Sequence, residues 1–353
     1  MKYYVTGATG FIGGHVARQL IASGHTVIAP VRTPAKAQDL VDLGVNVVKG
    51  DVTDKESMRA SMTGVDGVFH IAGWYKIGVK DKSMGMNINV DGTRNVLQLM
   101  KELNIPKGVY TSTLAVNSDT RGKVVDETYY HPDDGHWVSE YDRTKWVAHY
   151  AVAMPMVKEG LPLVTVMPGL VYGPGDTSSV HETFVQYLQR KLPMVPAQTT
   201  YCWAHVDDIA RGHIQAMEKG TAGEEYIIAG PVACVVEVLE IAEKITAVPA
   251  PAFIPLLAPS KRWPRSWAYL RRSSPFRNPT LPRVCGSLPR PILAATKKPG
   301  ANWATPFAPW KKVCAKRCST RCASSACNYP RYNKCKQRWL NCGAMLCNSA
   351  IAA

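Results

Sequence analysis

A turn with regularly spaced glycines, Thr6-Gly7-Ala8-Thr9-Gly10-Phe11-Ile12-Gly13, limits the folds that are open to this chain. The apolar run Tyr3–Val5 before it predicts a buried strand, and residues 16–21 after it predict a helix. The first glycine permits a tight turn, the second lets a backbone approach a pyrophosphate, and the third lets the helix pack closely on the strand. Free N–H groups at the positive helix end would bind the phosphates. The residues predicted to do so are Gly7, Thr9, Gly10, Phe11, Ile12 and Gly13.

Strand and helix patterns then alternate along the chain, which predicts an α/β fold. The next expected strands cover residues 25–31, 45–48, 67–73 and 107–113, and a short helix is expected around residues 35–43. Strands separated by helices at this spacing indicate a doubly wound parallel sheet, the Rossmann fold, with ligands at the carboxyl ends of the strands. We predict a dinucleotide-binding core over residues 1–165. Residues 166–247 are expected to supply the remaining core strands and part of a substrate region.

Residues at the ends of these strands predict the cofactor. In dinucleotide folds an acidic residue at the end of the second strand binds the ribose 2′-OH, whereas an arginine accommodates a 2′-phosphate. Arg32 therefore favours NADP(H), with NAD(H) or a solvated loop arginine as alternatives. Asp51 is expected to accept from an adenine amino group while Val52 packs on the ring; a helix cap is the other interpretation of Asp51. A small residue such as Ala72 lets a cofactor pass close to the backbone.

Tyr141 and Lys145 lie four residues apart at the start of an amphipathic helix, so they share one face. An ammonium beside a phenol favours the phenolate. We therefore expect Lys145 to lower the pKa of Tyr141 towards working pH, as proton transfer needs. The pair follows the glycine turn and a strand that ends in the hydroxyls of residues 111–113, in the order that such an active site requires.

Several motifs occur together in a fixed order over residues 1–245. They are the glycine turn, Asp51, Asn89, Thr113, the Tyr141/Lys145 pair, Pro168-Gly169, Tyr172-Gly173-Pro174 and His205-Val206-Asp207-Asp208. This set resembles the extended branch of the short-chain dehydrogenase/reductase superfamily, that is, the NAD-dependent epimerase/dehydratase family.

The resemblance implies a role for each of these positions. Tyr141 would be the general acid that protonates a carbonyl oxygen, or the base in the reverse direction. Lys145 would bind the nicotinamide ribose and tune Tyr141, and Thr113 would hydrogen-bond the substrate oxygen. Asn89 would support the helix or a relay water. The residues implied to flank the nicotinamide are Pro168, Leu170 and Val171.

The same resemblance narrows the chemistry. Dehydratases carry an Asp-Glu pair where Leu114 and Ala115 follow Thr113, and sugar-nucleotide epimerases place an Asn where this chain has Leu170. The pattern, with Arg32, looks more like dihydroflavonol reductase-type enzymes, which reduce a ketone or aldehyde on an aromatic or apolar substrate. A nucleotide-sugar epimerase and a catalytically impaired cofactor-binding or scaffolding protein are the alternatives. Candidate pocket residues are Trp74, Tyr75, His136, Trp137, Tyr172 and His181.

The composition of the chain changes abruptly near its last hundred residues. All 27 acidic residues lie at or before Glu243, whereas residues 246–353 hold 19 of the 42 lysines and arginines and eight of the ten cysteines. The net charge of +15 therefore describes two unlike segments and does not indicate a nucleic-acid-binding domain. A basic disordered tail, a metal module and a disulfide cluster are alternatives, but the cysteine spacings lack a CxxC pair and no metal site is predicted.

We favour the hypothesis that residues 248–353 are translated out of frame. Shifting the frame forces a Leu and a Gly from Asn302-Trp303-Ala304, and a Glu from Trp310-Lys311, whatever codons are used. The hidden string looks like the C-terminal helical region of the superfamily, so substrate binding by this chain is in question. The nucleotide sequence would decide the matter.

The expected partner is a small-molecule substrate. We predict no nucleic-acid partner and no membrane association, because no secretory segment precedes the first strand and no apolar run approaches the length of a membrane span. The expected location is the cytoplasm. The resemblance implies a homodimer formed through the helices near residues 86–103 and 141–158.

Overall fold

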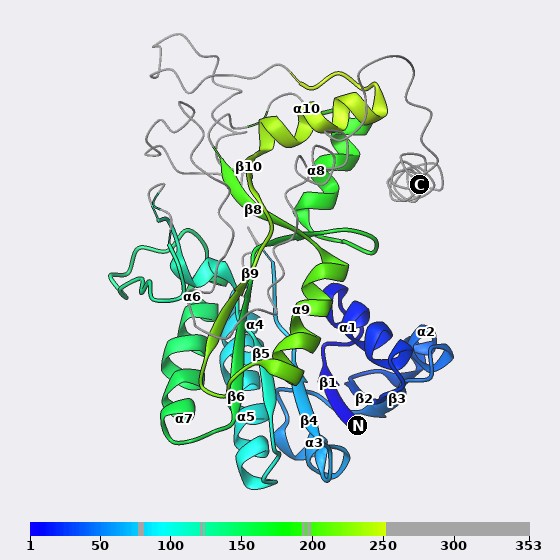
Figure 1. Ribbon diagram of the computed structural model, residues 1–353, viewed down its shortest axis with the longest axis vertical. Coiled ribbons are helices and arrows are strands. Elements are labelled where there is room, and N and C mark those ends of the chain that lie inside the picture. The colour runs from blue at the N-terminus through cyan, green and yellow to red at the C-terminus, as the bar shows by residue number, and fades with distance from the viewer. Residues whose placement is uncertain (77–80, 121–122, 124, 193–194, 196–198, 252–353) are drawn as a thin grey trace, which may run out of the picture.

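The central feature of the fold is a seven-stranded parallel sheet in the order β3-β2-β1-β4-β5-β6-β9 (Figure 1). The computed structural model describes residues 1–76, 81–120, 123, 125–192, 195 and 199–251. Every neighbouring pair in this sheet is parallel, which confirms the doubly wound α/β fold. The strands are β1 (Lys2–Thr6), β2 (Thr26–Val31), β3 (Asn46–Lys49), β4 (Gly67–His70), β5 (Gly108–Thr111), β6 (Leu163–Pro168) and β9 (Glu225–Ile228).

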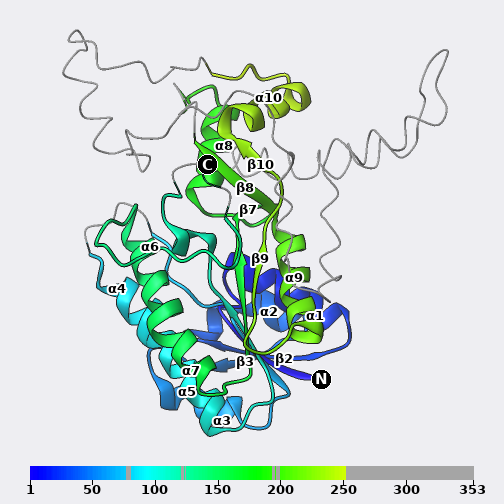
Figure 2. The ribbon, with the colours of Figure 1, turned by 60° about the vertical axis from the view of Figure 1, so that its left-hand side comes forward.

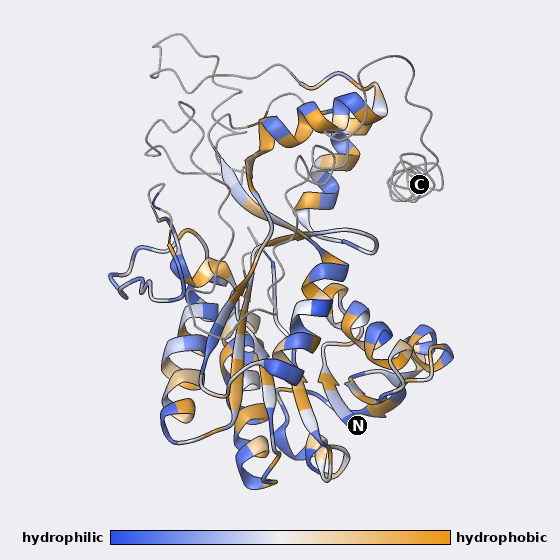
Figure 3. Cartoon of the chain, in the orientation of Figure 1, coloured by the Kyte–Doolittle hydropathy of each residue, from blue (hydrophilic) through white to orange (hydrophobic). Residues whose placement is uncertain are grey.

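Helices cover both faces of this sheet (Figure 2). On one face α1 (Phe11–Ala22) packs against α9 (Val206–Lys219). The other face carries α3 (Lys55–Met62), η2 (Met86–Asp91), α5 (Gly92–Glu102), η4 (Val147–Ala153) and α7 (Met154–Lys158). Successive strand residues point to opposite faces, so Val5 joins the apolar core under α1 and Tyr4 joins the core under α5. Figure 3 shows the resulting apolar stretches along the strands.

A smaller region lies beyond the carboxyl ends of the large sheet (Figure 1). Its three strands run in the order β10-β8-β7, with β7 parallel and β10 antiparallel to β8. A separate apolar cluster, which includes Tyr187 and Leu239, joins its two helices. The elements are β7 (Leu170–Tyr172), α8 (Ser179–Leu188), β8 (Thr200–His205), β10 (Val232–Cys234) and α10 (Val235–Thr246).

Two expected helices have a more irregular form than the sequence predicts. The one at residues 86–103 begins earlier, with the short α4 (Ser83–Gly85), and continues through the π-helical turn η2 into α5. The one at residues 35–43 is broken into η1 (Pro34–Lys36) and α2 (Gln38–Asp42). Pro34 can begin a helical turn because it needs no N–H partner there.

Residues 252–353 lie outside the described residues, and so does nearly all of the segment predicted to be out of frame. Among the helices that the structure does describe, none is both long enough and apolar enough to span a bilayer.

Candidate active site

The glycine turn has the close contacts that its sequence requires. Gly7 has a φ of 73°, and a Cβ there would lie 2.7 Å from the Ala72 backbone nitrogen. A Cβ on Gly13 would lie 2.1 Å from the Gly7 carbonyl oxygen, so helix α1 approaches the turn as closely as a glycine allows. Thr9 and Gly10 are exposed. Within the described residues no side chain caps α1, and its first turn holds no acidic residue.

This helix end fits an anionic group. Its first-turn N–H groups have no side-chain acceptor in the described part of the chain, and the helix dipole adds positive potential there. The residues predicted to hold a pyrophosphate therefore lie together, at the carboxyl end of β1.

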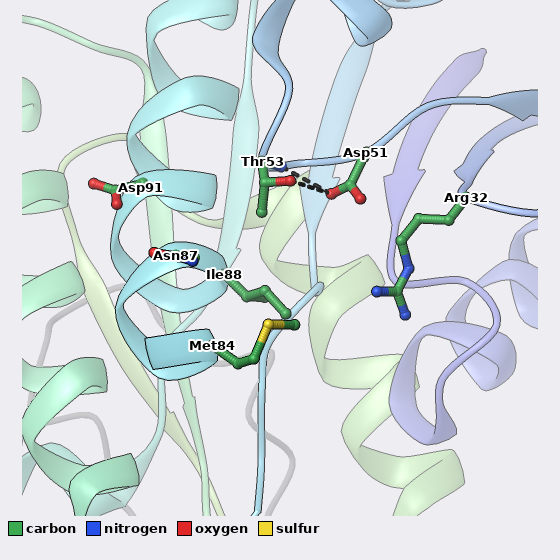
Figure 4. A pocket seen from close by; sticks show the side chains of 7 residues that line it. All are labelled: Arg32, Asp51, Thr53, Met84, Asn87, Ile88 and Asp91. Carbon is green, nitrogen blue, oxygen red and sulfur yellow. Dashed lines mark hydrogen bonds between the residues drawn. The ribbon is translucent and has the colours of Figure 1, made fainter. Parts of the chain in front are cut away.

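A pocket of about 330 Å³ brings together Arg32 and Asp51, two of the three residues predicted to bind the adenosine end of the cofactor. Arg32 lies on one side of it and the η2 residues on the other, with Asp51 between them (Figure 4). The Asp51 carboxylate accepts from the Thr53 N–H and hydroxyl, both at 2.9 Å. Asp54, not Asp51, caps α3, so the helix-cap interpretation of Asp51 is wrong. The pocket is lined by Arg32, Asp51, Thr53, Met84, Asn87, Ile88 and Asp91.

A buried hydrogen-bond chain connects the glycine turn with helix η2. The Thr93 hydroxyl donates to the Asn89 carbonyl at 2.6 Å, so it accepts from His70 Nε2–H at 3.0 Å. His70 Nδ1 then accepts from the Thr6 hydroxyl at 2.9 Å, and the Thr6 oxygen accepts from the Ile71 and Ala72 N–H groups. Burial, together with the charge of Lys145, lowers the pKa of His70 to about 3, so this ring is neutral.

Asn89 extends the chain to the helix that carries Tyr141. Its side chain binds the backbone N–H and carbonyl of Trp74, at 2.6 and 3.1 Å, and donates to the Thr144 hydroxyl at 3.0 Å. Thr144 in turn donates to the Tyr141 carbonyl. Asn89 is buried and supports the backbone, in keeping with the supporting role expected of it.

The three residues predicted to be catalytic converge at the carboxyl end of β5. Helix α6 (Glu140–Trp146) carries Tyr141 and Lys145 on one face, and the phenol of Tyr141 lies beside Thr113, whose side chain acts to lower the pKa of that phenol. Lys145 is buried, and its Nζ donates to the Thr111 carbonyl at 2.8 Å and the Tyr110 hydroxyl at 3.3 Å. Because β1 ends at the same edge of the parallel sheet, these side chains and the glycine turn lie on one side of the fold.

The expected effect of Lys145 on Tyr141 is not found. Burial raises the pKa of Tyr141 far above its usual value, and the opposing influence is the Thr113 hydrogen bond. Burial also lowers the pKa of Lys145 to about 7. A lysine that is half neutral at pH 7 and bonded to the Thr111 carbonyl has little charge with which to stabilise a phenolate. The phenol is therefore held in its protonated form.

A model of the NAD dependent epimerase/dehydratase family matches residues 3–229. The chain belongs to this family. A putative dihydroflavonol 4-reductase of Synechocystis sp. is 31% identical over 265 residues, which cover 73% of this chain and 76% of that protein. Cinnamoyl-CoA reductase 1 of Petunia hybrida is 31% identical over 258 residues, covering 68% and 76%. UDP-glucuronic acid 4-epimerase from Bacillus cereus, solved in complex with NAD, is 26% identical with a TM-score of 0.62, covering 72% and 86%.

Family membership and the reductase relatives make this chain an NAD(P)-dependent enzyme of the short-chain dehydrogenase/reductase type. The residues expected to flank the nicotinamide lie at the junction of the two sheets. Pro168 ends β6, and Leu170 and Val171 begin β7. A Cβ on Gly169, between them, would lie 2.4 Å from the Cys202 carbonyl oxygen, so the chain passes closely against β8 at this point.

The aromatic residues predicted to form a substrate pocket separate into two groups. Tyr75 belongs to the site, because its ring meets the Tyr141 ring edge-on at 4.8 Å. The Tyr172 ring instead meets the rings of Trp203, at 6.2 Å, and His205, at 5.6 Å. Trp137 packs against Trp146 in a separate apolar cluster.

The other three candidates make different contacts. The His136 side chain is 88% exposed and pairs with Asp134. Trp74 packs over Gly85, and His181 lies half-buried on α8.

Sequence reasoning missed several residues of the site. His70, Tyr110 and Ser179 contact residues that the sequence motifs assign to the site. A histidine and a tyrosine inside apolar strands carry no sequence signal that separates them from ordinary core residues. His149 could have been found, since it follows Tyr141 and Lys145 at the same four-residue interval. Its ring joins the Ser112 hydroxyl, at 2.6 Å, to a Glu225 carboxylate oxygen, at 3.0 Å.

The buried Lys145 gives a pH-dependent stability that can be measured. Between pH 7 and 10.5 the unfolded chain keeps a proton that the folded chain has lost, so the free energy of unfolding rises with pH across this window. We expect Lys145→Met to remove this rise and to make the protein more stable below pH 7. Urea unfolding at several pH values measures both effects. Lys101→Met, at a lysine that is 57% exposed, is the matched control, and equal slopes in the two variants would contradict the assignment.

Proposed function

We propose that this protein reduces a ketone or aldehyde on a small aromatic or apolar substrate, with NADP(H) as the preferred cofactor. The observation that carries the proposal is the Tyr141 phenol, which lies beside Thr113 at the sheet edge where the glycine turn also lies. This phenol is protonated at neutral pH, and a reductase needs a group that gives a proton to the substrate oxygen.

In this mechanism each residue has a separate task. A nicotinamide cofactor held at the glycine turn supplies the hydride. Thr113 positions the carbonyl oxygen, and Tyr141 protonates that oxygen as negative charge develops on it. Lys145, whose Nζ donates to the Thr111 carbonyl, would bind a ribose hydroxyl and return a proton towards Tyr141. The Tyr75 ring against Tyr141 gives the site an apolar wall that suits a flat substrate.

The sequence relatives favour reduction over epimerisation. The relatives from Synechocystis sp. and Petunia hybrida are named as reductases, whereas the structural neighbour from Bacillus cereus is a sugar-nucleotide epimerase. Leu170 offers no hydrogen bond where the resemblance expects an epimerase to place an Asn.

The test is a spectrophotometric screen of NADPH and NADH oxidation with panels of aryl ketones, aliphatic ketones, aldehydes and nucleotide sugars. It uses both this chain and a frame-restored version of it, because the segment after residue 251 bears on substrate binding. We expect oxidation of NADPH with an aromatic ketone or aldehyde by the restored protein. If the restored protein oxidises neither cofactor with any substrate, the proposal fails, and turnover of a nucleotide sugar alone would favour the epimerase.

Arg32 provides a direct test of cofactor preference. We expect Arg32→Ala to raise the KM for NADPH by about 30-fold, the equivalent of one charged hydrogen bond of about 2 kcal/mol, and to leave the KM for NADH unchanged. Initial rates with each cofactor measure the split. Arg18→Ala, which removes an exposed arginine of α1 that does not line the pocket, is the control. An equal rise in the KM for NADPH and the KM for NADH would show that Arg32 does not bind the 2′-phosphate.

A further inference from the structure

Three motifs that lie far apart in the sequence meet at one side chain, His15. This residue lies on α1, directly after the glycine turn. Its Nδ1 is 2.7 Å from Asp207 Oδ1, at the start of α9. Its Nε2 is 3.0 Å from the carbonyl oxygen of Pro174, in the loop after β7. The ring is only 14% exposed, so it bridges these elements from within the fold.

The two partners determine which form of the ring can make both bonds. A carboxylate and a backbone carbonyl are acceptors only, so each must receive a proton from the ring. Neutral imidazole has one N–H and can satisfy one partner, whereas the imidazolium ion satisfies both. The His15 bridge is therefore complete only when the ring is charged.

The groups around His15 include a second histidine, His205, that also lies near the Asp207 carboxylate. The titratable and charged groups on the elements packed against it are Arg18, Asp176, His205, Asp207 and Asp208. His205 Nδ1 is 3.3 Å from the Asp207 backbone nitrogen and 3.6 Å from Asp207 Oδ2, whereas His15 binds Asp207 Oδ1. Asp176 accepts from the Ser178 N–H, Asp208 pairs with Arg211, and Arg18 is exposed.

The loop that His15 holds lies against the proposed phosphate site. A Cβ on Gly175 would lie 4.0 Å from the Phe11 ring, and Phe11 is the first residue of α1. The Phe11 ring also meets His15 edge-on at 5.9 Å. Gly173 is held tightly as well, since its φ is 144° and a Cβ there would lie 2.8 Å from Val206. The loop is thus fixed between the N-terminal ends of α1 and α9.

We propose that His15, in its imidazolium form, is a positioning residue. It holds the loop Gly173–Gly175 and the start of α9 against the helix of the glycine turn, an arrangement that we call the clasp. Cofactor affinity then depends on the charge of the His15 ring. This inference rests on the proposed cofactor site. Loss of the ring proton releases either Pro174 or Asp207, and the segment over Phe11 is then held less firmly.

The test compares wild type, His15→Gln and the control His25→Gln in the full chain. Glutamine can make one of the two bonds at any pH, and His25 lies at the opposite end of the sheet, against Tyr3. The dissociation constant for NADPH is measured by fluorescence from pH 5.5 to 8.5, a range that spans histidine titration. Because the cofactor's own 2′-phosphate also titrates, the quantity compared is the ratio of variant to wild type.

We expect the ratio for His15→Gln to fall from about five at pH 5.5 to about one at pH 8.5, since a partly exposed charged bond is worth about 1 kcal/mol. The ratio for His25→Gln should stay near one throughout. A His15→Gln ratio that does not change with pH overturns the clasp.

If wild type binds neither NADPH nor NADH at any pH, the proposed function fails instead, and the clasp is then tested by thermal unfolding without cofactor. In that case the melting temperatures of wild type and His15→Gln must converge as the pH rises, and a constant difference overturns the clasp.

Discussion

Tyr141→Phe is expected to lower kcat for carbonyl reduction by about 1000-fold, within the range that general acid catalysis contributes. The phenylalanine keeps the ring that meets Tyr75 and removes only the hydroxyl beside Thr113. The KM for NADPH should change little, because the phenol acts on the substrate oxygen. Steady-state rates at saturating cofactor, with the substrate found in the screen, measure the loss.

The matched control for this variant is Tyr150→Phe. Tyr150 lies on the same run of helix, but its ring packs on Tyr130 and Trp146, away from Thr113. It should retain wild-type rates. If Tyr141→Phe retained more than about a tenth of the wild-type kcat, the phenol would not be the proton donor, because even a modest general acid contributes about 100-fold.

Much of this site follows from local rules of sequence. The glycine spacing, the strand that ends at Arg32 and the four-residue interval between Tyr141 and Lys145 each depend on residues close together in the chain. A regular α/β topology then brings the ends of parallel strands to one edge. The residues that sequence could predict are therefore those whose positions the topology determines.

The parts that could not be predicted depend on contacts between distant segments. The pKa of Tyr141 is governed by burial, which the sequence pattern underestimates. Lys145 bonds the Thr111 carbonyl and does not lower that pKa. His70 serves the glycine turn through Thr6, 64 residues away in sequence. The His15 bridge to Asp207 spans 192 residues. Periodicity and spacing describe local structure, so such long-range pairings leave no pattern in them.

Gly13→Ala is expected to abolish cofactor binding and to lower the free energy of unfolding by about 2–3 kcal/mol, the cost of forcing an extra methyl group into a closely packed site. The added Cβ would lie 2.1 Å from the Gly7 carbonyl oxygen and 2.6 Å from its carbon. Both are backbone atoms, so neither can swing aside as a side chain would. The helix must instead move away from the turn, and the N–H groups at its start move with it.

Gly14→Ala separates the effect of the close contact at Gly13 from the effect of replacing any glycine inside a helix with alanine. A Cβ on Gly14 would lie 3.2 Å from the Ala8 carbonyl oxygen, a contact that a shift of a few tenths of an ångström relieves. Alanine is also favoured over glycine inside a helix by about 1 kcal/mol. We therefore expect Gly14→Ala to bind NADPH normally and to have a free energy of unfolding within about 1 kcal/mol of the wild-type value. Urea unfolding and cofactor fluorescence test both variants. Normal NADPH binding by Gly13→Ala would show that the close approach of α1 to the turn is not what forms the phosphate site.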